Sequence, residues 1–214
     1  MNKNFLTRIV LLFFGFVITA LGSTIFLLSN LGSDAFTVMM QGISEIVPMS
    51  IGLINSLVSL ILIIIIYCID KRFIKVGTIL SMFVIGPSMD IWSKVLSGFF
   101  NTYVTTMEIR VVSIIIGVII VGIGVALACS VNMGTHVNDV IPVFISFKLP
   151  KLQFRIIRVV YDLSQILIGY SLGGIFGIGT VICALLLGPF LQFTIPRCEK
   201  ILEQNFKIDL QKVL

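Results

Sequence analysis

The sequence predicts an all-α polytopic membrane protein with six transmembrane helices, arranged as two inverted three-helix repeats. Three observations lead to this prediction. The 214-residue chain is 57% hydrophobic and only 12% charged, whereas soluble domains are about 45–50% apolar and about 25% charged. Its apolar runs are long enough to cross a hydrocarbon core about 30 Å thick. The third observation is an internal repeat.

The repeat aligns residues 8–92 with residues 110–194 without a gap, at a shift of 102 positions. Nineteen of the 85 aligned pairs are identical. The identical pairs include glycine, proline, asparagine and arginine, which rarely match by chance in an apolar chain. We therefore expect two membrane repeats, 8–92 and 110–194, followed by a basic cytoplasmic tail at 195–214.

Each repeat contains three predicted spans and one short segment. The spans cover 8–29, about 51–69 and about 76–93 in the first repeat, and 110–131, 153–171 and 178–195 in the second. Between the first two spans of each repeat lie the more polar segments 34–47 and 136–149. Fourteen residues make only about 21 Å of helix, less than the hydrocarbon core. We expect short interfacial or re-entrant helices there, with full spans as the alternative.

The basic residues predict the orientation. With the N-terminus in the cytoplasm, the inner side receives 13 lysines and arginines and the outer side only Lys94 and Arg110. The connection "DKRFIK" of the first repeat is basic, while its counterpart "SLGGIFG" has no charge. This positive-inside bias predicts a multi-pass protein of the bacterial cytoplasmic membrane with both termini in the cytoplasm. Three spans per repeat make the second copy inverted, as in many transporters.

The third span of each repeat contains a Gly-Pro pair, Gly86-Pro87 in the first and Gly188-Pro189 in the second. Proline lacks an N–H and clashes with the carbonyl four residues earlier, and glycine loosens the same turn. We expect both helices to be broken near the middle of the bilayer, with freed carbonyls that need partners in protein or water. Paired interruptions mark the central site of many transporters. A proline kink that serves packing alone is the alternative.

The segments after the first spans carry polar residues in matching places. Asn30-x-Gly32 and Asn132-x-Gly134 predict left-handed C-caps. Ser33, Asp34 and Thr135 are then expected to cap the short helices, because their side chains accept from free N–H groups. The functional interpretation is that the positive N-termini of the short helices point at an anionic group between the repeats.

Three ionisable residues of the second repeat need an explanation. His136 and Asp139 are three residues apart and share a helix face, which suits either a proton relay or an ordinary polar pair. Asp162 lies about 15 Å into a predicted span, where a charge costs about 2.5–3.5 kcal/mol. Arg158, one turn earlier, predicts an ion pair that reduces this cost. A structural ion pair and a solute or proton site are both open.

The stretches "LGSDAFTVMMQGISEIVPMSIG", "NMGTHVNDV" and "GGIFGIGTVICALLLGP" resemble the YczE/YyaS/YitT-like family of bacterial integral membrane proteins, over about residues 8–194. By this resemblance Asp139 and Asp162 fall on acidic positions of the family and Gln41 on a Gln-Gly pair. Thr37 stands where the family's first aspartate is expected. The family has no assigned biochemical function, so the resemblance implies fold and location rather than activity.

We therefore predict a small-solute transporter or exporter with a central site between two Gly-Pro-broken helices. The alternative is a non-transporting accessory or regulatory membrane subunit, including the substrate-capture subunit of a larger transporter. No enzyme motif, metal site or cofactor site is expected. The expected partners are the lipid bilayer, a small solute, and a second copy or another membrane protein, but not nucleic acid. The candidate substrate-binding residues are Asn30, Asp34, Thr37, Gln41, Gly86, Pro87, Asn132, His136, Asp139, Arg158, Asp162, Gly188 and Pro189.

Overall fold

The computed structural model describes residues 3–206, and that range is helical with no strand. Its elements follow the order expected from the sequence, with three long helices and one short helix in each half. They are α1 (Lys3–Ser29), α2 (Ala35–Ile46), α3 (Ile51–Asp70), the 3₁₀ turn η1 (Lys71–Phe73), α4 (Val76–Tyr103), α5 (Met107–Ser130), α6 (Val137–Lys148), α7 (Phe154–Ser171) and α8 (Ile178–Phe206).

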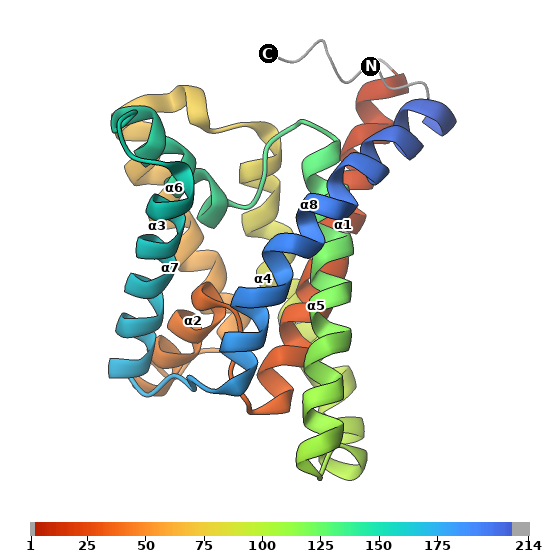
Figure 1. Cartoon of the computed structure of the whole chain (residues 1–214), viewed down its shortest axis with the longest axis vertical. Helices are drawn as coiled ribbons and strands as arrows, with labels where there is room; N and C mark the ends of the chain where they lie inside the picture. The colour runs from red at the N-terminus through yellow and green to blue at the C-terminus, as the bar shows by residue number, and fades with distance from the viewer. Residues whose placement is uncertain (1–2, 207–214) are drawn as a thin grey trace.

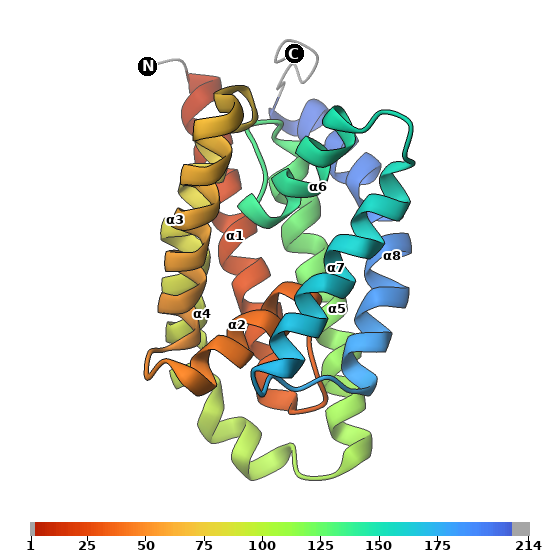
Figure 2. The same cartoon turned by 90° about the vertical axis from the view of Figure 1, so that its left-hand side faces the viewer.

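The long helices run lengthwise through the bundle and alternate in direction, and α1 begins at the end where α8 finishes (Figures 1 and 2). Five of them, α1, α3, α4, α5 and α8, are long and apolar enough to cross a membrane. The sixth predicted span forms α7, which is not among these five. It has 18 residues and carries Arg155, Arg158 and Asp162. The chain is thus a multi-pass helical membrane protein with one unusually polar long helix.

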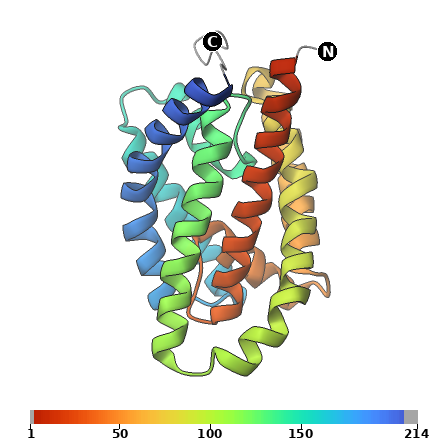
Figure 3. The ribbon, with the colours of Figure 1, turned by 90° about the vertical axis from the view of Figure 1, so that its right-hand side faces the viewer.

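The centre of the bundle is a close contact between α1 and α5, which lie side by side and antiparallel (Figure 3). A Cβ added to Gly15 would lie 3.0 Å from the carbonyl oxygen of Gly124, and one added to Gly22 would lie 2.9 Å from that of Gly117. Glycine permits this approach because it has no side chain. A shift of 102 residues maps Gly15 onto Gly117 and Gly22 onto Gly124. The two contacts therefore join the same two equivalent positions, once in each direction.

Each half also bonds to the connector of the other half. The backbone N–H of Gly77, in the first turn of α4, donates to Met133 at 2.9 Å, and that of Gly179, in the first turn of α8, donates to Leu31 at 2.8 Å. The accepting connectors turn through left-handed residues, as predicted: Asn30 and Asn132 have φ of 54° and 55°. The same kind of backbone hydrogen bond therefore joins each half to the connector of the other.

Short helices occur where the sequence predicts them, and neither α2 nor α6 is among the candidate spans. Each begins inside the bundle and runs outward, toward opposite ends (Figure 2). Asp34 caps α2 by accepting from the N–H of Thr37. The N-cap of α6 is His136, without a side-chain cap bond, so the predicted capping role of Thr135 is wrong.

The prediction of broken third helices is also wrong. Helix α4 continues through Pro87 and α8 continues through Pro189. One proline removes only one N–H donor, so the other backbone bonds keep each helix continuous. On α4 the carbonyl of Met82, in the same turn, also accepts from Ser56 Oγ on α3 at 3.0 Å. Helix α8 also extends past the predicted end at 195 to Phe206. The rest of the predicted tail, 207–214, lies outside the described residues.

Candidate functional site

Helix α7 carries a polar stripe made of Arg158, Tyr161, Asp162 and Gln165. Residues three and four apart lie on one face of a helix, so the four side chains form a continuous strip about two turns long. The strip reaches the first turn of α6, where Asn138 and Asp139 lie. The candidate site is this α6–α7 interface.

An ion triad forms its charged part. Arg158 Nη1 donates to Asp139 Oδ1 at 2.7 Å, and Arg158 Nε donates to Asp162 Oδ2 at 3.0 Å. The second contact confirms the ion pair predicted from spacing. The three side chains are each about one-third exposed, at 34%, 31% and 33% for Arg158, Asp139 and Asp162. Two carboxylates face one guanidinium, so the triad carries a formal charge of −1.

One carboxylate oxygen of the triad takes no part in these two bonds. Asp162 Oδ1 is buried and has no hydrogen-bond partner among residues 3–206. A buried acceptor without a donor is costly, more so when it is charged. The triad therefore has spare capacity for a hydrogen-bond donor, preferably a cationic one.

A neutral network adjoins the triad. Asn138 Oδ1 accepts from the hydroxyl of Tyr161 at 2.8 Å and from Gln165 Nε2 at 2.6 Å. Asn138 and Gln165 are only 6% and 3% exposed, and the Oε1 atom of Gln165 has no partner among the described residues. These contacts fix α6 against α7 and leave one more unsatisfied acceptor beside the triad.

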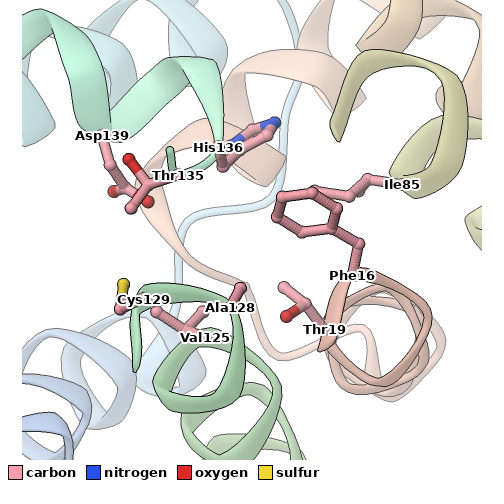
Figure 4. A pocket seen from close by; sticks show the side chains of 9 residues that line it. All are labelled: Phe16, Thr19, Ile85, Val125, Ala128, Cys129, Thr135, His136 and Asp139. Carbon is pink, nitrogen blue, oxygen red and sulfur yellow. The ribbon is translucent and has the colours of Figure 1, made fainter. Parts of the chain in front are cut away.

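The other side of Asp139 faces a small cavity of ≈ 10 Å³, the space of about one water molecule (Figure 4). Thr135, His136 and Asp139 line it from the start of α6, opposite Cys129 on α5. The His136 ring packs edge-on against Phe36 at the start of α2, with ring centroids 5.2 Å apart. The first turns of α2 and α6 thus meet in the bundle interior.

Carboxylates already occupy the positive ends of both short helices. Asp34 accepts from the N–H of Thr37 at 3.2 Å and from its hydroxyl at 2.7 Å. Asp139 lies in the first turn of α6. Because aspartate at a helix N-terminus neutralises the helix dipole, the expected anionic ligand at these ends is disfavoured, and the site is better matched to a cation.

The remaining predicted residues have separate structural contacts. Asn30 and Asn132 form the left-handed connectors. Gln41 Oε1 accepts from the backbone N–H of Ile175 at 3.1 Å, which ties α2 to the connection before α8. The Gly86-Pro87 pair lies where α4 packs on α3, and a Cβ added to Gly188 would meet no atom within 4 Å. The structure thus gathers Asp139, Arg158 and Asp162, with His136 beside them, and leaves the first Gly-Pro pair in the contact of α4 with α3.

Three members of the site are missing from the sequence-based candidates: Asn138, Tyr161 and Gln165. Tyr161 and Gln165 share the helical spacing of Arg158 and Asp162, which is the signal that finds them. Asn138 becomes a member only because α6 packs on α7. Within residues 3–206, no three histidine, cysteine, aspartate or glutamate side chains lie close enough to hold a metal ion.

Comparison with known proteins gives a family but no activity. An uncharacterised protein of Haemophilus influenzae is 30% identical over 185 residues, which cover 86% of this chain and 82% of the relative. The uncharacterised membrane protein YczE of Bacillus subtilis is 30% identical over 128 residues, 60% of this chain and 57% of its own length. The uncharacterised protein YyaS of the same organism is 23% identical over 186 residues, 87% of this chain and 91% of its own.

No solved structure matches the chain. The relatives named YczE and YyaS confirm the resemblance that the sequence motifs indicate. A family model described as a family of unknown function, DUF6198, matches residues 6–196. On this match over nearly the whole chain, the protein belongs to the DUF6198 family of bacterial membrane proteins.

Proposed function

We propose that the protein is a small-solute transporter of the bacterial cytoplasmic membrane, and that its solute is a cation. The observation that carries the proposal is the ion triad of Asp139, Arg158 and Asp162 inside the bundle. Ionisable residues within membrane helices are costly and usually mark a solute or ion pathway. Here the charges of the triad do not balance, and Asp162 keeps a buried oxygen without a partner among the described residues.

The proposal includes two inverted repeats, 8–92 and 110–194, with six spans in total. Support comes from contacts that occur twice at a shift of 102 residues: Gly15 with Gly124 and Gly22 with Gly117, and the N–H groups of Gly77 and Gly179 on opposite connectors. The antiparallel course of α1 and α5 fits opposite insertion of the halves (Figure 3). Transporters built in this way bind solute near the midplane, where the halves meet.

The same proposal sets the orientation. The start of α1, with Lys3 and Arg8, lies near the end of α8, with Arg197 and Lys200 (Figure 1). The positive-inside rule assigns that end of the bundle to the cytoplasm. In this orientation α7 is the sixth span. Two of its three charged residues are paired, because Arg158 bonds both to Asp139 and to Asp162, and this pairing lowers the cost of a membrane position.

Transport is tested in proteoliposomes loaded with a mixture of monoamines, diamines, amino acids, sugars and organic acids, with efflux followed by mass spectrometry. We expect at least one cationic solute to leave faster than from protein-free liposomes. Asp162→Asn should reduce that efflux at least about tenfold, the effect of one lost charge-assisted contact. Asp90→Asn is the matched control, because Asp90 accepts from Ser50 and from the N–H of Gly52 at the start of α3, away from the triad.

Efflux equal to that of protein-free liposomes across the whole panel would contradict transport. It would favour the alternative of an accessory or regulatory membrane subunit. Efflux that Asp162→Asn and Asp90→Asn reduce equally would contradict the assignment of the site, because the control leaves the triad intact.

A further inference from the structure

An apolar cleft of ≈ 380 Å³ lies between α3, α6 and α7, next to the candidate site. In Figure 2 these helices surround the region that faces the viewer, with α3 and α7 on either side. Ile65, Ile69 and Ile168 line the cleft and are 49%, 55% and 48% exposed, whereas Ile66 is 2% exposed. The cleft therefore opens sideways, toward the lipid, and closes inside the bundle. Its volume is that of a small-molecule binding pocket.

Within the described part of the chain, the polar residues that line the cleft are Tyr161, Ser164 and Gln165, all on α7. The Tyr161 hydroxyl donates to Asn138 and the Ser164 hydroxyl donates to the carbonyl of Tyr161, so both are occupied as donors. Gln165 differs, because its side chain is 97% buried while its Oε1 atom has no partner within the described part of the chain. The lining of the cleft thus includes one residue whose acceptor lacks a donor among residues 3–206.

Negative charge lies one turn away from that acceptor along α7. Asp162 is three residues before Gln165, on the same helix face, and its Oδ1 atom is also buried without a partner among residues 3–206. Arg158 supplies the opposing positive charge in the triad. A ligand group that reaches Gln165 enters a site with excess carboxylate.

The cleft walls cannot select a ligand by apolarity, because lipid tails are as apolar as the isoleucines that line it. A chain that moves from the bilayer into the cleft exchanges one hydrocarbon environment for another. The head group must therefore provide the difference in affinity. A head that donates a hydrogen bond and carries positive charge satisfies both Gln165 and the nearby carboxylates.

We propose that the cleft takes up a single-chain amphiphile with a primary ammonium head directly from the bilayer. The alkyl chain lies against Ile65, Ile69 and Ile168, and the ammonium group donates to Gln165 Oε1 in the field of Asp162. This inference rests on the proposed transport function and names its substrate class as lipophilic amines.

Binding is tested with the whole protein in phosphatidylcholine nanodiscs and radiolabelled dodecylamine. Unlabelled competitors share the same chain and differ in the head: dodecyltrimethylammonium has charge without a donor, dodecanol has a donor without charge, and dodecyl sulfate has the opposite charge. We expect saturable binding, with dodecylamine displacing the label at concentrations at least about tenfold lower than any of the other three.

Two variants with one matched control locate the site. Ile168→Trp places a larger ring at the mouth of the cleft, and Gln165→Leu removes the acceptor; each should weaken binding at least about tenfold. Leu167→Trp makes the same change one residue away, at a side chain that is 70% exposed and does not line the cleft, and should bind as the wild type does. Thermal unfolding of each variant checks that it is folded.

Equal displacement by all four heads, or unchanged binding by folded Ile168→Trp, would overturn the inference. Different results would contradict the transport proposal and the proposed binding of lipophilic amines. Saturable dodecylamine binding without efflux of any solute would contradict transport and keep this site. Efflux of a small hydrophilic cation that depends on Asp162, without dodecylamine binding, would contradict the lipophilic class and keep transport.

Discussion

The two Gly-Pro pairs have the same sequence but different surroundings. A Cβ added to Gly86 would clash with Ser56 Oγ and with the carbonyl oxygen of Gly52, whereas a Cβ added to Gly188 would meet nothing within 4 Å. Accordingly, α4 packs closely on α3, while α8 makes no comparable contact with α7. The motif is therefore a packing device in the first half and lacks that role in the second.

The partner helix explains the difference. The residues of α3 that meet Gly86 are Gly52 and Ser56, and their counterparts 102 positions later on α7 are Phe154 and Arg158. A phenylalanine and an arginine prevent the close approach that glycine and serine allow. Helix α7 packs against α2 and α6 instead, and there Arg158 forms the ion triad. The comparison teaches that the second half has exchanged a tight helix pair for a polar site.

The largest expected effect comes from filling the two glycine positions. Gly86→Leu should destabilise the protein by about 3 kcal/mol or more, because overpacking a closed contact forces the backbone apart. Gly188→Leu should change the unfolding free energy by less than about 1 kcal/mol, because there is space for the side chain and leucine favours helix. Thermal and denaturant unfolding in one detergent measures both. Equal destabilisation would contradict the difference in packing.

The next largest effect is expected at Arg158, the counterpart of Ser56 in the second half. Arg158→Ala leaves Asp139 and Asp162 side by side without their cation, and should cost roughly 1–3 kcal/mol, less than the 3–5 kcal/mol of a fully buried pair because the side chains are one-third exposed. Arg158→Ala with Asp139→Asn and Asp162→Asn should recover part of the loss. An Arg158→Ala variant as stable as the wild type would show that the triad has no structural role.

The smallest effect is expected at the equivalent position of the first half. Ser56→Ala removes the hydrogen bond to the carbonyl of Met82 and should cost about 0.5–1.5 kcal/mol, the usual value for one neutral bond. Unfolding in the same detergent measures it, and Ser97→Ala on an exposed part of α4 is the control, because its hydroxyl bonds only within its own helix. A larger loss of unfolding free energy in Ser56→Ala than in Arg158→Ala would contradict the expected order of these two positions.

Local signals in the sequence predict much of this fold. The left-handed Asn30 and Asn132, the cap at Asp34 and the Arg158–Asp162 pair follow from residue types and spacing within a few positions. The bond from Ser56 Oγ to the carbonyl of Met82 could not be predicted in this way, because the two residues lie on different helices. The same holds for the site: Asp139 meets Arg158, and Asn138 meets Tyr161 and Gln165, only after α6 and α7 have packed together.

Helix α7 is a second case that the sequence alone does not decide, because its hydropathy and its place in the repeat give different predictions. The repeat predicts a sixth span at 153–171, and composition alone excludes it from the candidate spans because of Arg155, Arg158 and Asp162. Arg158 is paired with Asp162 on α7 and, through a tertiary contact, with Asp139 on α6. Whether such a helix spans depends on those contacts and not on its own sequence.

Opposite insertion of the two halves is tested most directly by labelling two cysteines in equivalent connections, Arg72→Cys before α4 and Phe176→Cys before α8. Both side chains are exposed. The variants are made in a chain whose own cysteines, Cys68, Cys129, Cys183 and Cys198, are replaced by alanine. With a membrane-impermeant maleimide, the account predicts that intact cells label only Phe176→Cys and that permeabilised cells label both. Labelling of both positions from the same side of the membrane would contradict it.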